Sequence, residues 1–304
     1  MGKFSKIKVK APATTANVGS SFDCLGIAAE LFNYITLELS EEDHYFYNSQ
    51  VSKDHAFIFN IIDKFFEFEG KVRPKFKVLI DNDIPLSRGL GSSSAAIAST
   101  LVAVNALCFD EKYSLDELLS FAFRFEKHPD NLSPSFMGGM VISAINVDRV
   151  SYYKFENFVD SFIDKKLLFF VPDYFIDTEL SRDLLLKTSA YLSHREYIKG
   201  MNDSTLNIIA FAKGDFSALR KSMDDQVWHH QQRKSTIRFM DEIFKVAMEN
   251  KAYGVAISGS GPTLVMVADE QNAEMIKKAI FEITDGKFYD LRAAEKGVEI
   301  LWKK

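Results

Sequence analysis

The spacing of apolar residues along the chain predicts alternating strands and helices. Apolar and polar residues alternate over residues 3–10, as expected of a strand with one buried face. Between Phe57 and Phe68 apolar side chains recur every three or four positions and Gly70 follows, which predicts a helix that ends at a glycine. Similar patterns predict further strands near 34–39, 76–80, 150–155 and 167–171 and on both sides of residues 258–261, and helices at 92–107, 203–212, 215–226, 235–249 and 272–283.

Local signals mark where some of these elements begin and end. Pro12 predicts the end of the first strand, because proline lacks the N–H that a sheet ladder uses. Ser114 and Glu117 form a capping-box pattern, which predicts a helix that we expect to end near Pro129. The segment 136–142 is predicted to be a loop that leads into a strand.

The length and order of the elements indicate two domains. At 304 residues the chain has room for two domains of ordinary size or one large one, and its alternating elements are typical of a mixed α/β fold. The predicted strands at 150–155 and 167–171 bracket a boundary, which divides the chain into residues 1–160 and 161–304.

Composition excludes several classes of partner. A net charge of −5 and a pI near 5.8 give no support to a nucleic-acid or anionic-membrane partner. Cys24 and Cys108 form neither a disulfide framework nor a metal-ligand pattern, which suits a reducing cytoplasm. No apolar run is long enough to span a membrane. We therefore expect a soluble cytoplasmic protein, whose oligomeric state stays open with a homodimer as one option.

The strongest chemical signal is the stretch from Pro85 to Ala98, P-L-S-R-G-L-G-S-S-S-A-A-I-A, between a predicted strand and a predicted helix. Gly89 and Gly91 permit a tightly curled backbone that a ligand can approach closely, and the serines at 92–94 offer hydroxyls and an N-cap. Free N–H groups and the positive end of the helix dipole favour an anion there. The stretch is therefore predicted to be a phosphate cradle.

The loop differs from three other glycine motifs. It has no lysine after the second glycine, as a Walker A loop would, and Ser94 replaces the third glycine of the dinucleotide fingerprint. A serine-nucleophile elbow is nearly matched, but Ala95 replaces its final glycine. Taken alone, the loop is also compatible with an ordinary glycine turn capped by serine.

Three separated motifs now stand in order along the chain: A-P-A-T-T-A-N-V-G-S-S-F-D at 11–23, P-L-S-R-G-L-G-S-S-S-A-A at 85–96 and A-I-S-G-S-G-P-T at 256–263. Together they resemble the signature segments of the GHMP kinases, which phosphorylate galactose, homoserine, mevalonate and phosphomevalonate. A fourth segment, F-E-K-H-P-D-N-L-S-P-S-F-M-G-G-M at 125–140, is similar to the E-G-H-P-D-N segment of the homoserine kinases in that family.

The resemblance implies an α+β fold with a mixed-sheet N-terminal nucleotide-binding domain, a ferredoxin-like α/β-sandwich C-terminal domain, and an active site in the cleft between them. It implies phosphorylation of the side-chain hydroxyl of L-homoserine by ATP with Mg²⁺, a step of threonine biosynthesis. Ser92 and Glu126 would bind the metal, and Asn131 would lie beside the transferring phosphoryl group; these three are the expected catalytic residues. The expected ATP-binding residues are Leu86, Ser87, Arg88, Gly89, Leu90, Gly91, Ser92, Ser93, Ser94, Ala95 and Ala96.

By the same resemblance, five residues would bind the amino acid: Asn17, Asp23, His128, Arg182 and Arg233. Two arginines for the carboxylate and Asp23 for the ammonium would select an amino acid over a sugar or mevalonate, because a charged hydrogen bond contributes roughly 1.5–3 kcal/mol. The chain departs from the family pattern at Ala56 near the adenine, Lys127, Leu184-Leu185-Leu186, Gln226 and His230-Gln231-Gln232.

Three other interpretations stay open at the level of sequence. The acceptor could be mevalonate or another alcohol, or the chain could be a non-catalytic module that binds a metabolite. A serine hydrolase using Ser93 with His128 is the third, although Ala95 does not supply the elbow glycine.

Overall fold

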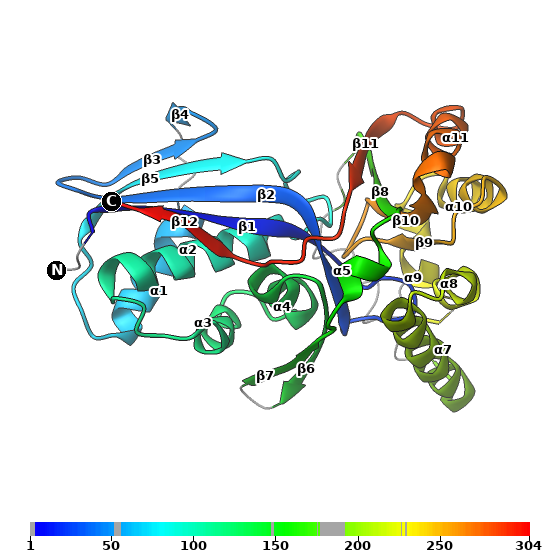
Figure 1. Ribbon diagram of the computed structural model, residues 1–304, viewed down its shortest axis with the longest axis horizontal. Helices are drawn as coiled ribbons and strands as arrows, with labels where there is room; N and C mark the ends of the chain where they lie inside the picture. The colour runs from blue at the N-terminus through cyan, green and yellow to red at the C-terminus, as the bar shows by residue number, and fades with distance from the viewer. Residues whose placement is uncertain are drawn as a thin grey trace.

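The computed structural model of the chain describes residues 4–51, 56–146, 149–174, 176, 192–225, 227–228 and 230–304. Arg182, the leucines at 184–186 and Gln226 therefore lie outside the described residues. The described elements form two adjoining domains, each built on one sheet (Figure 1). None of the helices in these ranges is both long enough and apolar enough to cross a membrane.

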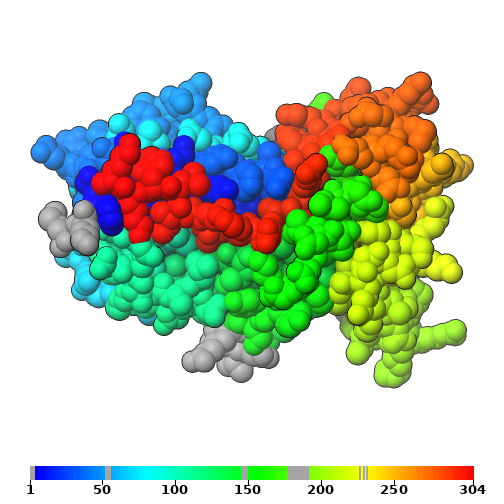
Figure 2. Space-filling model, in the orientation of Figure 1, coloured from blue at the N-terminus to red at the C-terminus, as the bar shows by residue number. Residues whose placement is uncertain are grey.

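The first domain is built on a mixed sheet. Its strands are β1 (Lys6–Ala16), β2 (Leu25–Ser40), β3 (His44–Tyr47), β4 (Gln50–Val51), β5 (Lys75–Asn82), β6 (Met140–Asn146), β7 (Arg149–Lys154) and β12 (Glu299–Lys303). The order is β12-β1-β2-β5-β3-β4, with β6 paired to β2 and β7 to β6. The β3–β5 pair is parallel and the other pairs are antiparallel. The last strand of the chain thus returns to the first sheet, and Figure 2 shows the C-terminal segment spread over this domain.

Four helices cover one face of this sheet (Figure 1). They are α1 (Ala56–Phe68), α2 (Ser92–Cys108), α3 (Leu115–Ala122) and α4 (Pro129–Met137). Helix α2 lies at the centre, because it contacts β1 and β2 on one side and the other three helices on the other. Its sequence of small and aliphatic residues, buried from Ala95 to Leu107 on nearly every side, is what such a sandwiched helix requires.

The second domain is built on an antiparallel sheet of order β11-β8-β10-β9. Its elements are α5 (Phe158–Ser161), β8 (Lys165–Pro172), α7 (His194–Lys213), α8 (Phe216–Ser222), α9 (His230–Arg233), the 3₁₀-helix η1 (Lys234–Thr236), α10 (Met240–Glu249), β9 (Gly254–Ile257), β10 (Leu264–Asp269), α11 (Glu270–Phe281) and β11 (Gly286–Leu291). Helices α10 and α11 pack on one face through a cluster that includes Phe170, Met266 and Ile276. On the other face, Phe169 and Phe211 belong to the apolar cluster of the first domain, so the core is continuous between the domains.

The structure confirms the helices expected at 57–68 and 92–107 and the capping box of Ser114 and Glu117. It corrects the end of the first strand. Strand β1 continues past Pro12 to Ala16, with a register shift between Pro12 and Ala13. Such an irregularity lets a strand hold a proline, which the prediction that Pro12 ends the strand did not consider.

Two further expectations about boundaries are wrong. The helix that begins after Ser114 ends at Ala122, and Pro129 starts a new helix instead of ending the old one. Proline is favoured at the first position of a helix, because its missing N–H would have no partner inside the helix. The residues Phe136 and Met137, expected in a loop, are the last residues of α4.

Aromatic packing under α1 gives a first testable prediction. The ring of Phe65, which is 1% exposed, makes edge contacts with Phe109, Tyr113 and Phe121 at centroid distances of 5.3, 5.6 and 5.0 Å. We expect Phe65→Ala to lower the free energy of unfolding by about 3–5 kcal/mol through lost burial and a cavity, measured by urea denaturation. The exposed Val72→Ala is the control, with a change within about 0.5 kcal/mol. A loss for Phe65→Ala as small as the control's would contradict the packing described.

Candidate active site

A cavity of about 870 Å³ lies where the two domains meet. Its wall is formed by the β1–β2 loop, the glycine loop before α2, the start of α4, and the loop between β9 and β10. It therefore brings together residues from all four motifs that the sequence analysis selected.

The glycine loop needs its glycines for close backbone approach. Gly91 has φ 66°, and a Cβ added there would lie 1.9 Å from Oγ1 of Thr14. A Cβ on Gly89, at φ 79°, would lie 2.1 Å from the carbonyl oxygen of Ser258. Gly91 is also the N-cap of α2 and offers no side-chain cap, so the expected serine N-cap is wrong. The positive end of α2 is left for a ligand.

The cavity exposes most of the predicted cradle. Residues 86–93 and Ala96 line it, whereas Ser94 and Ala95 are fully buried and do not. Their side chains point into the core on the opposite side of the first helical turn. Arg88 also lines the cavity, but its Nη1 donates to the carbonyl oxygens of Pro172, at 2.5 Å, and Tyr174. This arginine ties the glycine loop to the end of β8.

Asn131 lies against the glycine loop. Thr14 Oγ1 donates to Asn131 Oδ1 at 2.8 Å, and the Thr14 N–H donates to the carbonyl of Leu90 at 3.0 Å. The side chain of Asn131 is thus fixed at the point where β1 and the loop meet.

Side chains with oxygen atoms that can bind a metal lie beside the first turn of α2. Ser92 is the first residue of the helix, and Ser93 Oγ donates to Glu126 Oε2 at 3.1 Å. All three residues line the cavity. Hydroxyl and carboxylate oxygens are the ligands that Mg²⁺ prefers, so this donor set fits the predicted metal.

At one end of the cavity the structure brings Asn17, Asp23 and His128 together. Asn17 Oδ1 accepts from the N–H of Asp23 at 2.8 Å, and its Nδ2 donates to the carbonyl of Gly259 at 3.2 Å. His128 Nδ1 lies 3.3 Å from Asp23 Oδ1. Asn17 therefore orients the turn that carries Asp23.

Arg233 is the predicted arginine that the structure describes. It lines the cavity, is 3% exposed, and donates from Nη1 to the carbonyl of Gly259 at 2.8 Å. Nearby, the Nε2 of His230 accepts the N–H of Ile257 at 3.1 Å, and burial lowers the pKa of this histidine. His230 is therefore neutral and supports the strand that leads to Gly259.

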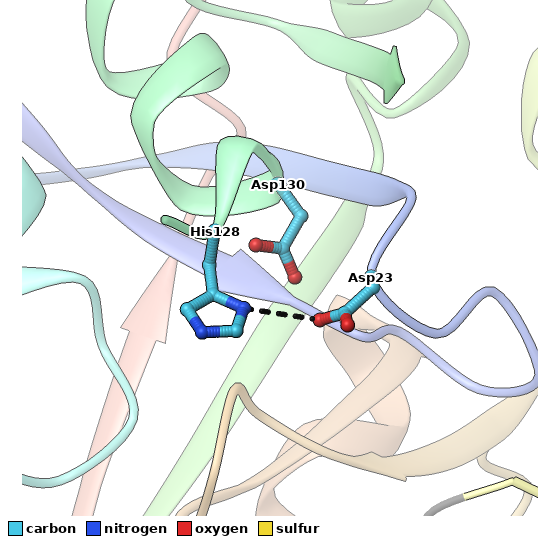
Figure 3. A group of neighbouring side chains, drawn as sticks. All are labelled: Asp23, His128 and Asp130. Atoms are coloured by element: carbon cyan, nitrogen blue, oxygen red, sulfur yellow. Dashed lines mark hydrogen bonds and ion pairs between the residues drawn. The ribbon is translucent and has the colours of Figure 1, made fainter. Parts of the chain in front are cut away.

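Sequence reasoning missed Asp130. It is 1% exposed, yet it lines the cavity, and its carboxylate lies beside His128 and Asp23 (Figure 3). One ligand atom from each of these three side chains lies within 4.8 Å of the others. Burial, with the charge of Asp23 as the next cause, raises the pKa of Asp130 to about 7. The D of H-P-D-N was visible in the sequence, but nothing there showed that its side chain is buried.

The other end of the cavity is apolar and was also not predicted. It is lined by Tyr45, Tyr47, Phe57, Ile58, Ile80 and Asn82. These are ordinary strand and helix residues, so no local motif marks them. A flat heterocycle would suit such a surface.

These features define a class of protein. A glycine loop at the N-terminus of a buried helix, oxygen donors beside it, and charged residues across one cavity are the parts of a small-molecule kinase that lacks a Walker lysine.

The comparisons with known proteins identify the family. The profile of the GHMP kinases N terminal domain matches residues 56–139, and that of the GHMP kinases C terminal domain matches residues 207–283. The homoserine kinase of Clostridium acetobutylicum is 36% identical over 277 residues, covering 90% of each chain. That of Caldicellulosiruptor bescii is 31% identical over 307 residues, covering 97% of this chain and 96% of its own. The crystal structure of homoserine kinase from Cytophaga hutchinsonii shares the fold, with a TM-score of 0.84, 24% identity and 99% coverage of both chains.

The chain belongs to the homoserine kinases of the GHMP kinase family, which are ATP-dependent phosphotransferases. The expected fold, a mixed-sheet domain followed by an α/β sandwich, is confirmed.

The close approach at Gly91 can be tested against a second glycine. Gly70 has a similar φ of 62°, but a Cβ added there would meet nothing within 4 Å. We expect Gly70→Ala to cost about 1 kcal/mol of stability from backbone strain. Gly91→Ala should cost more, about 2–4 kcal/mol, because Thr14 or the loop must also move. Thermal and urea unfolding of both variants measure this. Equal losses of stability in the two variants would show that the contact between residue 91 and Thr14 is not rigid.

Proposed function

We propose that this protein transfers the γ-phosphoryl group of ATP, with Mg²⁺, to the side-chain hydroxyl of L-homoserine and forms O-phospho-L-homoserine in the cytoplasm. The observation that carries the proposal is the arrangement of the cavity. A phosphate cradle lies between an apolar end and an end with both carboxylate and guanidinium groups, in a chain whose relatives are homoserine kinases.

In the proposed complex, the loop from Leu86 to Ser93 binds the triphosphate through backbone N–H groups and the N-terminus of α2. Ser92 and Glu126 hold Mg²⁺, which neutralises charge on the phosphates when it is bound. Ser93, whose hydroxyl donates to Glu126, orients that carboxylate. The tyrosines at 45 and 47 and Ile80 offer a surface for the base.

The amino acid binds at the opposite end. Asp23 accepts from the ammonium group, and His128, in contact with Asp23, lies beside it. Arg233 binds the carboxylate, with Arg182 as the second arginine of the proposal. Asn17 acts through Asp23 and Gly259, because its amide bonds to both.

The transfer step needs mainly positioning. The homoserine hydroxyl oxygen bonds to the γ-phosphorus, the bond from that phosphorus to the ADP oxygen breaks, and the hydroxyl proton passes to the phosphoryl group or to solvent. Asn131, held by Thr14 at the glycine loop, is the side chain placed to contact the transferring group. A serine hydrolase is not favoured, since Ser93 donates to Glu126 and not to His128.

Asp23 tests the assignment of the amino-acid end. We expect Asp23→Ala to raise the KM for homoserine roughly 10- to 100-fold, because a charged hydrogen bond of roughly 1.5–3 kcal/mol is lost. The affinity for ATP, measured by calorimetry, should change less than about 2-fold, since Asp23 contacts Asn17 and His128. The exposed Asp285→Ala is the control. An equal loss of ATP and homoserine affinity would contradict this role. No ADP release with homoserine, in a panel that includes mevalonate and galactose, would contradict the function itself.

Glu126 tests the assignment of the metal. We expect Glu126→Gln to raise the Mg²⁺ concentration for half-maximal activity by about 10-fold or more, because a carboxylate ligand becomes a neutral amide. Calorimetric binding of Mn²⁺ to the enzyme–nucleotide complex should weaken in parallel, which separates metal binding from turnover. The exposed Glu282→Gln is the matched control. If neither the Mg²⁺ dependence of activity nor the binding of Mn²⁺ changes, the assignment of Glu126 as a metal ligand is wrong.

A further inference from the structure

Asp130 is a buried carboxylate that the residues around it leave incompletely satisfied. Its side chain is 1% exposed, and its Oδ1 makes no hydrogen bond to any residue within the described ranges. Burying a carboxylate without hydrogen-bond donors lowers the stability of the fold, so a buried carboxylate of this kind suggests a functional role. The side chain is a wall of the cavity, and it points toward the space shared with Asp23 and His128 (Figure 3).

The charges around Asp130 are mostly negative. Burial is the main cause of its raised pKa; the carboxylates of Asp23 and Glu126 raise it further, while His128 and the N–H of Asn131 act in the opposite direction. Cys24, beside Asp23 on the same loop, is the other titratable neighbour, and the pKa of its thiol is raised by burial first and by Asp130 and Asp23 as well. Two carboxylates this close favour binding of a cation between them.

The geometry of the helix directs the side chains of Asp130 and Asn131 toward different parts of the cavity. Consecutive residues of a helix point about 100° apart, as 3.6 residues per turn require. Asn131 bonds Thr14 at the glycine loop, whereas Asp130 faces Asp23. Asp130 therefore lies on the amino-acid side of the cavity and not on the phosphoryl side.

We propose that Asp130 is a second acceptor for the ammonium group of the amino-acid substrate, so that Asp23 and Asp130 bind this cation as a pair. The proposal rests on the proposed function and adds a specificity-determining residue to it. The ammonium group has three N–H donors, which the carboxylates of Asp130 and Asp23 can share. An acceptor without a positive charge supplies no cation to the two carboxylates, so the pair disfavours alcohols such as sugars.

A cycle of one variant and three acceptors tests the proposal. The acceptors are L-homoserine, 3-aminopropan-1-ol, which lacks the carboxylate, and 4-hydroxybutyrate, which lacks the ammonium. We expect Asp130→Asn to lower kcat/KM roughly 10- to 100-fold for the two ammonium compounds, the loss of one charged hydrogen bond. For 4-hydroxybutyrate the change should be under about 3-fold. Where turnover is too slow, the inhibition constant against homoserine replaces kcat/KM.

Proton release gives a second readout that a structural role would not move. An ammonium group favours the charged form of Asp130, so homoserine binding near pH 7 should release protons, measured by calorimetry in two buffers of different ionisation enthalpy. The KM for homoserine should accordingly fall as the pH rises from 6 to 8. Asp130→Asn should abolish the release, and Asp285→Asn, on the surface, should leave it unchanged.

Folding of the variant is monitored by its pH-dependent stability. The pKa of Asp130 is raised in the folded state, so this carboxyl binds more protons folded than unfolded between about pH 4 and 7, and its contribution to stability falls as the pH rises. Asp130→Asn removes this loss, and we expect it to be at least as stable as the wild type at pH 8.

The outcomes separate this proposal from the function on which it rests. If the wild type does not phosphorylate homoserine, the proposed function fails. If it does, and Asp130→Asn affects all three acceptors equally or none of them, the ammonium assignment alone is wrong. Binding of Mn²⁺ to the nucleotide-free enzyme that disappears in Asp130→Asn would likewise overturn it in favour of a metal site.

Discussion

The active site depends on how closely three loop backbones approach one another at the junction of the domains. Ser258 Oγ donates to the carbonyl of Gly89 at 2.6 Å and lies at hydrogen-bond distance, 2.9 Å, from Thr15 Oγ1. The N–H of Gly259 donates to the carbonyl of Ala16 at 2.8 Å. Side chains at these glycines would push the loops apart. The end of β1, the glycine loop and the β9–β10 loop meet here. These contacts therefore hold the two domains together at the cavity.

This junction also explains why the cavity is electrically asymmetric. The N-terminus of α2 opens on the glycine loop without a side-chain cap, so its amides and its dipole favour anions. The H-P-D-N segment contributes carboxylate and imidazole groups on the other side of Asn131. The charges of a single cavity can therefore direct the nucleotide to one end and a zwitterion to the other. No Walker lysine is needed where helix amides and a metal neutralise the phosphates.

The sequence predicted elements best where local chemistry decides the structure. Periodicity located α1, the run of small and aliphatic residues after the glycine loop located α2, and the Ser114 capping box located the start of α3. It failed where tertiary contacts decide, as at Pro12, where a bulge carries the strand onward, and at Pro129, which begins a helix. For the site as well, the sequence predicted the residues of local motifs and not those placed by tertiary packing. Motif residues such as Asp23 and Asn131 were found by resemblance, whereas the apolar wall and the burial of Asp130 depend on packing between distant segments.

In the proposed complex, charge complementarity on both sides of the acceptor distinguishes an amino acid from the other substrates of the family. The guanidinium of Arg233 is buried, and burial lowers the pKa of the nearby His230. The carboxylates of Asp23 and Asp130 line the same cavity. Mevalonate could satisfy the arginine but would leave two carboxylates without a cation, and a sugar would satisfy neither side. In the proposed complex, selection against these alcohols follows from the burial of Asp130 as well as from attraction to homoserine, because an unpaired buried carboxylate is costly.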